Sequence, residues 1–501
     1  MPNRPSASLA KPSLDKDLEK IVHVEAAART TGAGVIPHSM ALVFLGLSAL
    51  VAGVYSGVTA DAAIVVFGAI LGGYMALNIG ANDVANNVGP AVGSRALTMV
   101  GALIIAAIFE SAGALIAGGD VVATISKGII DPSLVADTTT FVWAMMAALL
   151  SAAIWVNLAT FIGAPVSTTH AVVGGVMGAG IAAVGFQLVN WGTLSAIAAS
   201  WVISPVLGGI IAAMFLAFIK VNLIYREDKI AAARRWVPLL VAIMAGAFAT
   251  YLAIKGFKRV WTPDATTVSL VGIVVFAAVW LIVRPLIHRQ SEGMENRNQS
   301  LRTLFRIPLI CSAAMLSFAH GANDVANAIG PLAAILHSTQ FGDVAGNVAV
   351  PVWIMMIGAF GISLGLFLYG PKVVRMVGEK ITKMNPMRAY CVAQSAAITV
   401  IIASWLGLPV SSTHIAVGAV FGVGFFREIF TRRSRRRREM VLRGRADHDL
   451  NTDNEPAPEV LQHRKLVRRA HFLTIVAAWI VTVPATAVLA ALAFFGLSFV
   501  F

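Results

Sequence analysis

Two copies of one carboxylate motif are the residues best suited to chemistry in an otherwise apolar chain. Gly80–Pro90 reads GANDVANNVGP and Gly321–Pro331 reads GANDVANAIGP, so nine of eleven positions are identical. Each copy centres on one aspartate, Asp83 or Asp324. An Asn stands at −1 and another at +3 of each aspartate: Asn82, Asn86, Asn323 and Asn327. On a helix these two positions share a face, so each copy presents one carboxylate with two amides.

A second duplicated motif carries hydroxyl groups. Pro165–Gly180 reads PVSTTHAVVGGVMGAG and Pro409–Gly424 reads PVSSTHIAVGAVFGVG, with ten of sixteen positions identical. Each run of hydroxyls precedes a Gly-rich apolar helix: Ser167, Thr168, Thr169, Ser411, Ser412 and Thr413. Hydroxyls at a helix start can act as N-caps. The free N–H groups and the positive dipole end of the same helix start favour an anion, and two symmetric copies favour a binding role.

Three further titratable residues lie in or beside apolar segments. His170 and His414 end the PVSTTH and PVSSTH runs. They are either satisfied structural residues or groups for proton transfer. Glu110, in FESAGA, lies deep inside an apolar segment, where a coupling role or a structural polar role is expected.

The composition places these motifs in a membrane. Of 501 residues, 57% are hydrophobic and 13% are charged, against about 25% charged in soluble domains. Apolar stretches recur at the length that a membrane-spanning helix needs. Thirteen such segments are expected, at 39–58, 62–82, 96–119, 140–163, 167–188, 193–219, 236–254, 267–287, 304–323, 347–371, 388–408, 410–428 and 470–500.

Two neighbouring pairs of segments have very short apolar connections. The pair 140–163 with 167–188 and the pair 388–408 with 410–428 can each be two spans or one re-entrant hairpin. The predicted fold is therefore an all-α integral membrane protein, an inverted-repeat helical bundle of about 11–13 hydrophobic segments with two re-entrant hairpins.

The distribution of Lys and Arg predicts the orientation. When the gaps between segments are numbered from the N-terminal tail, even gaps hold 34 of the 38 basic residues and odd gaps hold 4. By the positive-inside rule, the N-terminus is cytoplasmic and the C-terminus is not. The run Arg432–Arg438 then lies in a cytoplasmic loop, where it meets anionic lipid headgroups. No aromatic residues interleave with it, which argues against nucleic-acid binding despite the net charge of +13.

The order of the motifs predicts that the two halves face opposite sides of the membrane. The first carboxylate motif ends segment 2 and its copy ends segment 9, an odd step of seven. Inverted repeats are typical of alternating-access carriers, whose site lies where the halves meet. Two carboxylates there would repel a bare anion. The pattern therefore favours an anion that carries protons, as phosphate does, moved together with Na⁺ or H⁺.

The duplicated GANDVAN and PVS(S/T)TH motifs resemble those of the PiT family of inorganic phosphate transporters, over roughly residues 62–220 and 304–500. The resemblance implies a secondary symporter of the cell (inner) membrane, with re-entrant hairpins and often a homodimeric state. It implies that phosphate contacts Asn82, Asp83, Asn323, Asp324, Ser167, Thr168, Thr169, Ser411, Ser412 and Thr413. The coupling ion, Na⁺ or H⁺, would involve Asp83, Asn86, Asp324, Asn327 and Glu110, with Na⁺ near Asp83 and Asp324. Gln394 stands where many relatives have Glu, which changes the second-half carboxylate.

The predicted organisation follows from the repeats. It comprises a cytoplasmic tail 1–38, an extra helix 39–61, a first transport repeat 62–220, a linker with two helices 221–303, a second repeat 304–428, a basic cytoplasmic loop 429–469 and a last helix 470–501. The predicted function is phosphate symport without a cofactor. A carrier of sulfate or another oxyanion is the first alternative, and a membrane phosphate receptor or phosphotransferase is a weaker one. The sequence has no P-loop, no nucleophile with an evident base and no metal-ligand cluster, so we expect no enzyme.

Overall fold

The computed structural model describes residues 35–57, 61–131, 134–135, 137–162, 166–255, 263–344, 350–376, 384–433 and 469–500. Within these ranges the chain is almost entirely helical, and the β-structure is one isolated bridge between Ile130 and Val189. The helices are Val35–Ser56, α2 (Ala62–Asn82), α3 (Val84–Gly93), α4 (Met99–Ala117), α5 (Gly119–Ala123), η1 (Thr124–Gly128), α6 (Thr138–Ile162), α7 (Thr168–Ala183), η3 (Phe186–Leu188), α8 (Trp191–Ile219), η4 (Lys220–Ile224), α9 (Lys229–Lys255), α10 (Ala265–Gln290), α11 (Asn298–Leu304), α12 (Arg306–Phe341), α13 (Val352–Met376), α14 (Pro386–Trp405), α15 (Ser412–Arg433) and α18 (Arg469–Val500).

The helices have the length and apolarity of membrane spans. Eleven of those described qualify singly, and α11 with α12, bent by 41° between them, makes a twelfth. Large apolar side chains are exposed along α8, α10 and α18, including Val202, Leu281 and Val488. Lipid tolerates such surfaces, and a helix satisfies its own backbone groups there. The structure thus confirms the predicted all-helical, multi-pass membrane fold.

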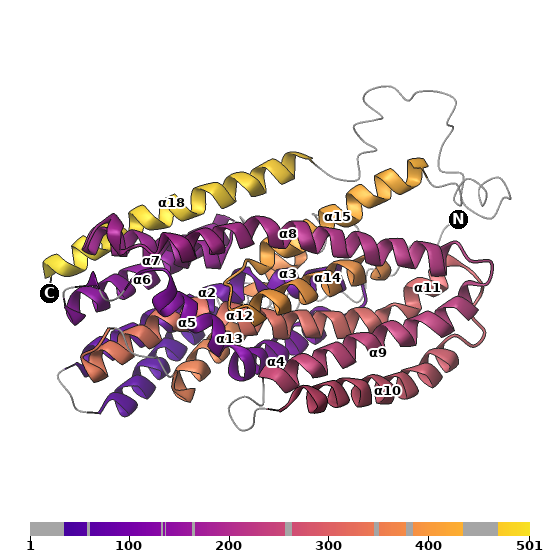
Figure 1. Ribbon diagram of the computed structural model, residues 1–501, viewed down its shortest axis with the longest axis horizontal. Coiled ribbons are helices and arrows are strands. Elements are labelled where there is room, and N and C mark those ends of the chain that lie inside the picture. The colour runs from indigo at the N-terminus through magenta and orange to yellow at the C-terminus, as the bar shows by residue number, and fades with distance from the viewer. Residues whose placement is uncertain are drawn as a thin grey trace, which may run out of the picture.

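The two helices that begin at the hydroxyl motifs each pack on a long helix from the other half of the chain. α7 packs along α18, and α15 packs along α8 (Figure 1). Small residues allow the close approach, since Gly178 faces the backbone of Ala487 and Gly422 faces that of Gly209. The two hydroxyl motifs are therefore held by helices that lie far from them in the sequence.

The carboxylate motifs lie on helices at the centre of the bundle. α12 lies in the middle of Figure 1 and packs on α4, while α2 packs on α13. The first glycine of each motif is the contact point in both pairs. A Cβ on Gly80 would lie 1.9 Å from the carbonyl oxygen of Ile362, and one on Gly321 would lie 2.1 Å from that of Glu110. Both positions thus require glycine for close approach of two backbones.

One predicted segment end was wrong. The segments 62–82 and 304–323 were both expected to end at the carboxylate motifs, where the apolar run stops. α2 does end at Asn82, and α3 begins after Asp83, whereas α12 continues through the second motif without a break. Polar side chains end an apolar run, but they do not end a helix whose polar face is covered by protein. Pro90 and Pro331 are likewise inside α3 and α12.

The predicted cytoplasmic tail and basic loop fall mostly outside the described residues. The first described helix begins at Val35, inside the predicted tail 1–38, and α15 continues to Arg433, past the predicted loop start at 429. Residues 434–468 are not described.

Gly80→Ala is expected to lower the stability of the folded protein. The added methyl group would collide with the backbone of α13, and overpacking of this kind costs about 1–3 kcal/mol. The melting temperature in detergent, followed by loss of the monodisperse peak on size exclusion after heating, measures the effect. Gly496→Ala is the matched control, because no atom lies within 4 Å of a Cβ at that position. Equal melting temperatures for the two variants would contradict the close approach.

Candidate functional site

The structure gathers the predicted binding and coupling residues in the protein interior. Each is at most 6% exposed: Asn82, Asp83, Asn86, Glu110, Ser167, Thr168, Thr169, Asn323, Asp324, Asn327, Ser411, Ser412 and Thr413. None of these side chains faces lipid. The polar groups must therefore satisfy one another, because an unpaired polar group in a membrane interior is costly.

Asp83 joins the two hydroxyl motifs. Its carboxylate accepts a hydrogen bond of 2.6 Å from the Thr168 hydroxyl and one of 3.0 Å from the Thr413 hydroxyl. Thr168 opens α7 and Thr413 lies in the first turn of α15. The starts of α7 and α15, residues 167–170 and 411–414, therefore meet at one carboxylate. We call them the paired helix starts.

The second Asn of each carboxylate motif binds the hydroxyl motif of the other copy. Asn86 donates to the Thr413 hydroxyl at 2.8 Å, and Asn327 donates to the Thr169 hydroxyl at 3.1 Å. Ser412 in turn donates to the Asp324 carboxylate at 3.1 Å. The hydrogen bonds from Asn86 and Asn327 cross between the two copies, which ties the halves together at this point.

The first Asn of each motif braces its own copy. Asn82 donates to the Thr160 hydroxyl on α6 at 2.9 Å, and Asn323 donates to the Ser404 hydroxyl on α14 at the same distance. The Asn323 side-chain oxygen also accepts from the backbone N–H of Val410 at 3.2 Å. These amides fix the helices that precede the paired helix starts. Asn82 and Asn323 therefore help to position the hydroxyl groups.

The serine of each hydroxyl motif caps its helix. Ser167 accepts from the backbone N–H of His170 at 3.1 Å, and Ser411 accepts from that of His414 at 3.2 Å. An N-cap takes one of the four unpaired N–H groups of a helix start. The N–H groups at the first two positions of a helix have no partner within the helix, and in α7 and α15 these positions carry the hydroxyl residues.

Glu110 reaches the second aspartate through a histidine that the sequence reasoning missed. His320 Nδ1 lies 3.2 Å from a Glu110 carboxylate oxygen, and its Nε2 lies 2.8 Å from an Asp324 carboxylate oxygen. Asn87 donates to Glu110 at 2.9 Å. His320 stands four residues before Asp324 on one helix, a spacing that puts both on one face and that could have revealed it. The first copy offers no hint, since Ile79 holds that position.

The carboxylates of Asp83 and Asp324 meet at the centre of the site. One ligand atom from each, together with one from His320, lies in a group whose members are all within 4.8 Å of one another. Several buried acceptor oxygens of the two carboxylate motifs and of Glu110 have no donor in the described part of the chain: Asn82 Oδ1, Asn87 Oδ1, Glu110 Oε2, Asp324 Oδ1 and Asn327 Oδ1. Such a concentration of acceptors suits a bound cation, or an anion that carries its own protons.

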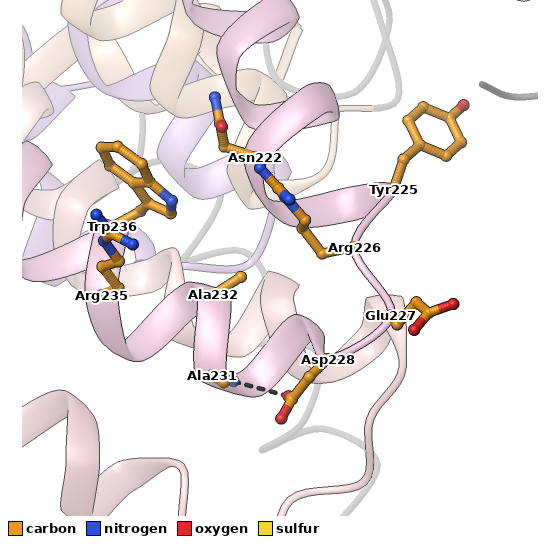
Figure 2. Close-up of a pocket in the computed structure, with 9 residues that line it drawn as sticks. All are labelled: Asn222, Tyr225, Arg226, Glu227, Asp228, Ala231, Ala232, Arg235 and Trp236. Atoms are coloured by element: carbon orange, nitrogen blue, oxygen red, sulfur yellow. Dashed lines mark hydrogen bonds between the residues drawn. The ribbon is translucent and has the colours of Figure 1, made fainter. Parts of the chain in front are cut away.

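A separate surface pocket contains none of the predicted site residues. It lies between η4 and the first turns of α9, and its wall mixes cationic and anionic side chains with an aromatic ring (Figure 2). Asp228 there accepts a hydrogen bond of 2.8 Å from the backbone N–H of Ala231 at the start of α9. The pocket is lined by Asn222, Tyr225, Arg226, Glu227, Asp228, Ala231, Ala232, Arg235 and Trp236.

Comparison with known proteins identifies the family. The phosphate transporter family matches residues 79–490. A "Putative phosphate permease" of Helicobacter pylori (strain ATCC 700392 / 26695) is 44% identical over 97% of this chain and 99% of its own length. Another of Pyrococcus abyssi is 40% identical over 72% of this chain and 88% of its own.

A solved structure named as the sodium-dependent phosphate transporter superposes with a TM-score of 0.77 at 34% identity. The match covers 88% of this chain and 100% of that one. A match of this extent and identity agrees with the helical architecture described above. The chain belongs to the phosphate transporter family.

Proposed function

We propose that this protein is a secondary active symporter that moves inorganic phosphate across the cell membrane together with Na⁺, by alternating access. The observation that carries the proposal is the double hydrogen bond at Asp83, from Thr168 of one copy and Thr413 of the other. It brings the carboxylate motif of the first half and the hydroxyl motifs of both halves to one buried place. A site shared by two halves is what an alternating-access carrier needs.

The paired helix starts supply the groups for an anion. The first turns of α7 and α15 offer unpaired N–H groups and two positive dipole ends. The hydroxyls of Thr168, Thr169, Ser412 and Thr413 lie within the same turns and are buried. Together they can replace the water around a tetrahedral oxyanion, as helix N-termini do in other phosphate sites.

The acceptor oxygens supply the groups for the coupling ion. Asp83, Asp324, Asn86 and Asn327 bring oxygen ligands, the type that hard cations prefer. Pro90 and Pro331 lack an N–H, so the helix leaves the carbonyls four residues earlier, at Asn86 and Asn327, without their usual donor. Sodium is favoured by the name of the solved relative, a sodium-dependent phosphate transporter.

The two carboxylates favour phosphate over sulfate. Phosphate keeps a proton at neutral pH and can donate a hydrogen bond to Asp83 or Asp324. Sulfate has no proton to donate, so its oxygens would face the carboxylates as like charges in a medium of low dielectric constant. Na⁺ between anion and carboxylates reduces the remaining repulsion. Selectivity would thus come from the same two residues that hold the cation.

We further propose that residues 62–220 and residues 304–428 with the last helix 470–501 are inverted repeats, with two re-entrant hairpins, α6–α7 and α14–α15. The matched contacts Gly80 with Ile362 and Gly321 with Glu110 support a pseudosymmetric packing of the halves. The charge distribution supports a cytoplasmic N-terminus and a non-cytoplasmic C-terminus. The resemblance to the family also supports a homodimer as the assembled form.

Radiolabelled phosphate uptake into proteoliposomes tests the function. With inward Na⁺ or H⁺ gradients imposed separately, we expect saturable uptake driven by Na⁺ and weak competition by sulfate. Uptake driven by H⁺ alone would show that the coupling ion is H⁺ and not Na⁺. Equal competition by sulfate would show that the carrier is not selective for phosphate. Phosphate binding without any flux would show a receptor and refute the carrier.

Asp83→Asn and Asp324→Asn are expected to abolish phosphate uptake, because each removes one negative charge and a cation ligand at the centre. Both variants should stay folded, since Asn keeps the shape and part of the hydrogen bonding. Uptake per amount of reconstituted protein is the measurement. Asp61→Asn, an exposed carboxylate before α2 without a side-chain cap, is the control and should transport normally. Full activity in either central variant would show that the substituted aspartate is not part of the transport site.

Thr413→Val is expected to raise the phosphate KM by about tenfold or more, since it removes a hydroxyl bound to Asp83 and Asn86 and takes one hydrogen bond from each of these buried groups, a cost of about 1–3 kcal/mol. Thr413→Ser keeps the hydroxyl and is the matched control, which should retain a KM near that of the unmodified protein. Initial rates over a range of phosphate concentrations separate the two. A Val variant with an unchanged KM would show that the hydroxyl only supports the fold.

A further inference from the structure

Four aromatic rings form a continuous column next to the candidate site. The Trp201 ring stacks on His170, with centroids 3.7 Å apart and planes tilted by 28°. The Trp479 ring stacks on His414 with the same distance and angle. The two histidine rings lie next to each other, with centroids 4.4 Å apart and planes tilted by 55°. We call this set the ring column.

The ring column connects the two halves at the paired helix starts. His170 and His414 lie in the first turns of α7 and α15, directly after the hydroxyls, and are 4% and 1% exposed. The tryptophans come from α8 and α18, the helices that follow the hydroxyl motif of each copy. Any change in the relative position of α7 and α15 must therefore slide or separate the two histidine rings.

Two polar contacts hold the rings of the first copy, His170 and Trp201, in place. His170 Nδ1 lies 2.7 Å from the Ser167 hydroxyl oxygen. The Trp201 indole N–H donates to the carbonyl of Pro409 at 3.2 Å, which lies in the hydroxyl motif of the other copy. The pair of His170 and Trp201 thus contacts both its own helix start and the hydroxyl motif of the other copy.

The second copy has the same residue types but, among the described residues, lacks the contact between histidine and serine. Ser411, His414 and Trp479 correspond to Ser167, His170 and Trp201. Three nitrogens have no hydrogen-bond partner in the part of the chain that the structure describes: both ring nitrogens of His414 and the indole nitrogen of Trp479. Pro165, the counterpart of Pro409, lies outside that part.

A buried imidazole without any partner is unfavourable, and the adjacent Ser411 could satisfy it, as Ser167 satisfies His170. Two identical sets of groups in different states within one molecule are what an inverted-repeat carrier shows when its halves hold different conformations. The opposite-facing state is obtained when the halves exchange those conformations. In the second copy, His414 can therefore form its hydrogen bond with Ser411 in the opposite-facing state.

We propose that His170 and His414, with Trp201 and Trp479, are positioning residues of the transport cycle. The ring column aligns the paired helix starts, and a latch between histidine and serine is closed in only one copy at a time. In the structure the first latch is closed, and in the opposite-facing state the second closes while the first opens. This inference rests on the proposed symport function and assigns to the repeats the contact that distinguishes the two states.

The test measures the phosphate KM from each face of the membrane, in right-side-out and inside-out vesicles that contain the full chain. His170→Phe keeps the stack and breaks the first latch, and Trp201→Phe keeps the stack and removes the indole hydrogen bond to Pro409 that accompanies the closed latch; both destabilise the present state. His414→Phe removes the second latch and Trp479→Phe removes the indole N–H that would accompany it, so both destabilise the opposite state instead. Since apparent affinity on one face scales with the population that opens there, the two pairs should shift the ratio of outside to inside KM in opposite directions. Each shift should be about fivefold, the effect of one neutral hydrogen bond.

His337→Phe is the matched control, because His337 lies on α12 against Phe341 and outside the ring column. Its KM ratio should equal that of the unmodified protein. Shifts in the same direction for both pairs, or no shift in either, would overturn the alternating latch. If His414→Phe fails to fold, Trp479→Phe decides the second copy alone. Vesicles of the unmodified protein that take up no phosphate from either face would refute the symporter itself, which is a different outcome.

Discussion

The burial of two carboxylates in one apolar bundle is the constraint on which the rest of the structure depends. Asp83 and Asp324 are each 1% exposed and lie within the same small group of ligand atoms. Like charges in a medium of low dielectric constant repel strongly, and each also loses its water. The fold must therefore bring donors to both from every side. Thr168 and Thr413 do this for Asp83, and Ser412 and His320 do it for Asp324.

The donors around the two aspartates are not symmetric, although the motifs are. Gly321 packs on the backbone of Glu110, and Gly80 packs on that of Ile362. By the same correspondence, Glu110 of the first half matches Ile362 of the second, and His320 of the second half matches Ile79 of the first. A histidine and a carboxylate therefore support Asp324, and two apolar side chains take the corresponding positions for Asp83. The two aspartates therefore have different electrostatic surroundings, so they need not bind the same ion equally well.

The bilayer explains why such polar chemistry is confined to one place. Outside the centre, the helices are apolar on nearly all faces and expose large side chains where lipid would lie. Adhesion between helices then comes from close packing of small residues, as where α7 meets α18 and α15 meets α8. Each of these contacts lies within a few turns of a hydroxyl motif. Packing between distant parts of the chain consequently fixes the positions of Thr168 and Thr413.

The sequence by itself determined the fold class and most residues of the polar centre, though not His320. Apolar length and charge placement are local quantities, and the two duplicated motifs identify Asp83, Asp324 and the hydroxyl runs without coordinates. The resemblance carried by those motifs also pointed to the family that the comparisons show.

Only the tertiary structure decided how these residues are paired. That Asn86 binds Thr413, that Asn82 braces Thr160, and that His320 joins Glu110 to Asp324 follow from contacts between helices far apart in sequence. The helix end at the second carboxylate motif was misjudged for the same reason. Whether a polar residue ends a helix depends on which neighbour covers it, and hydrophobic periodicity along one chain segment contains no record of that neighbour.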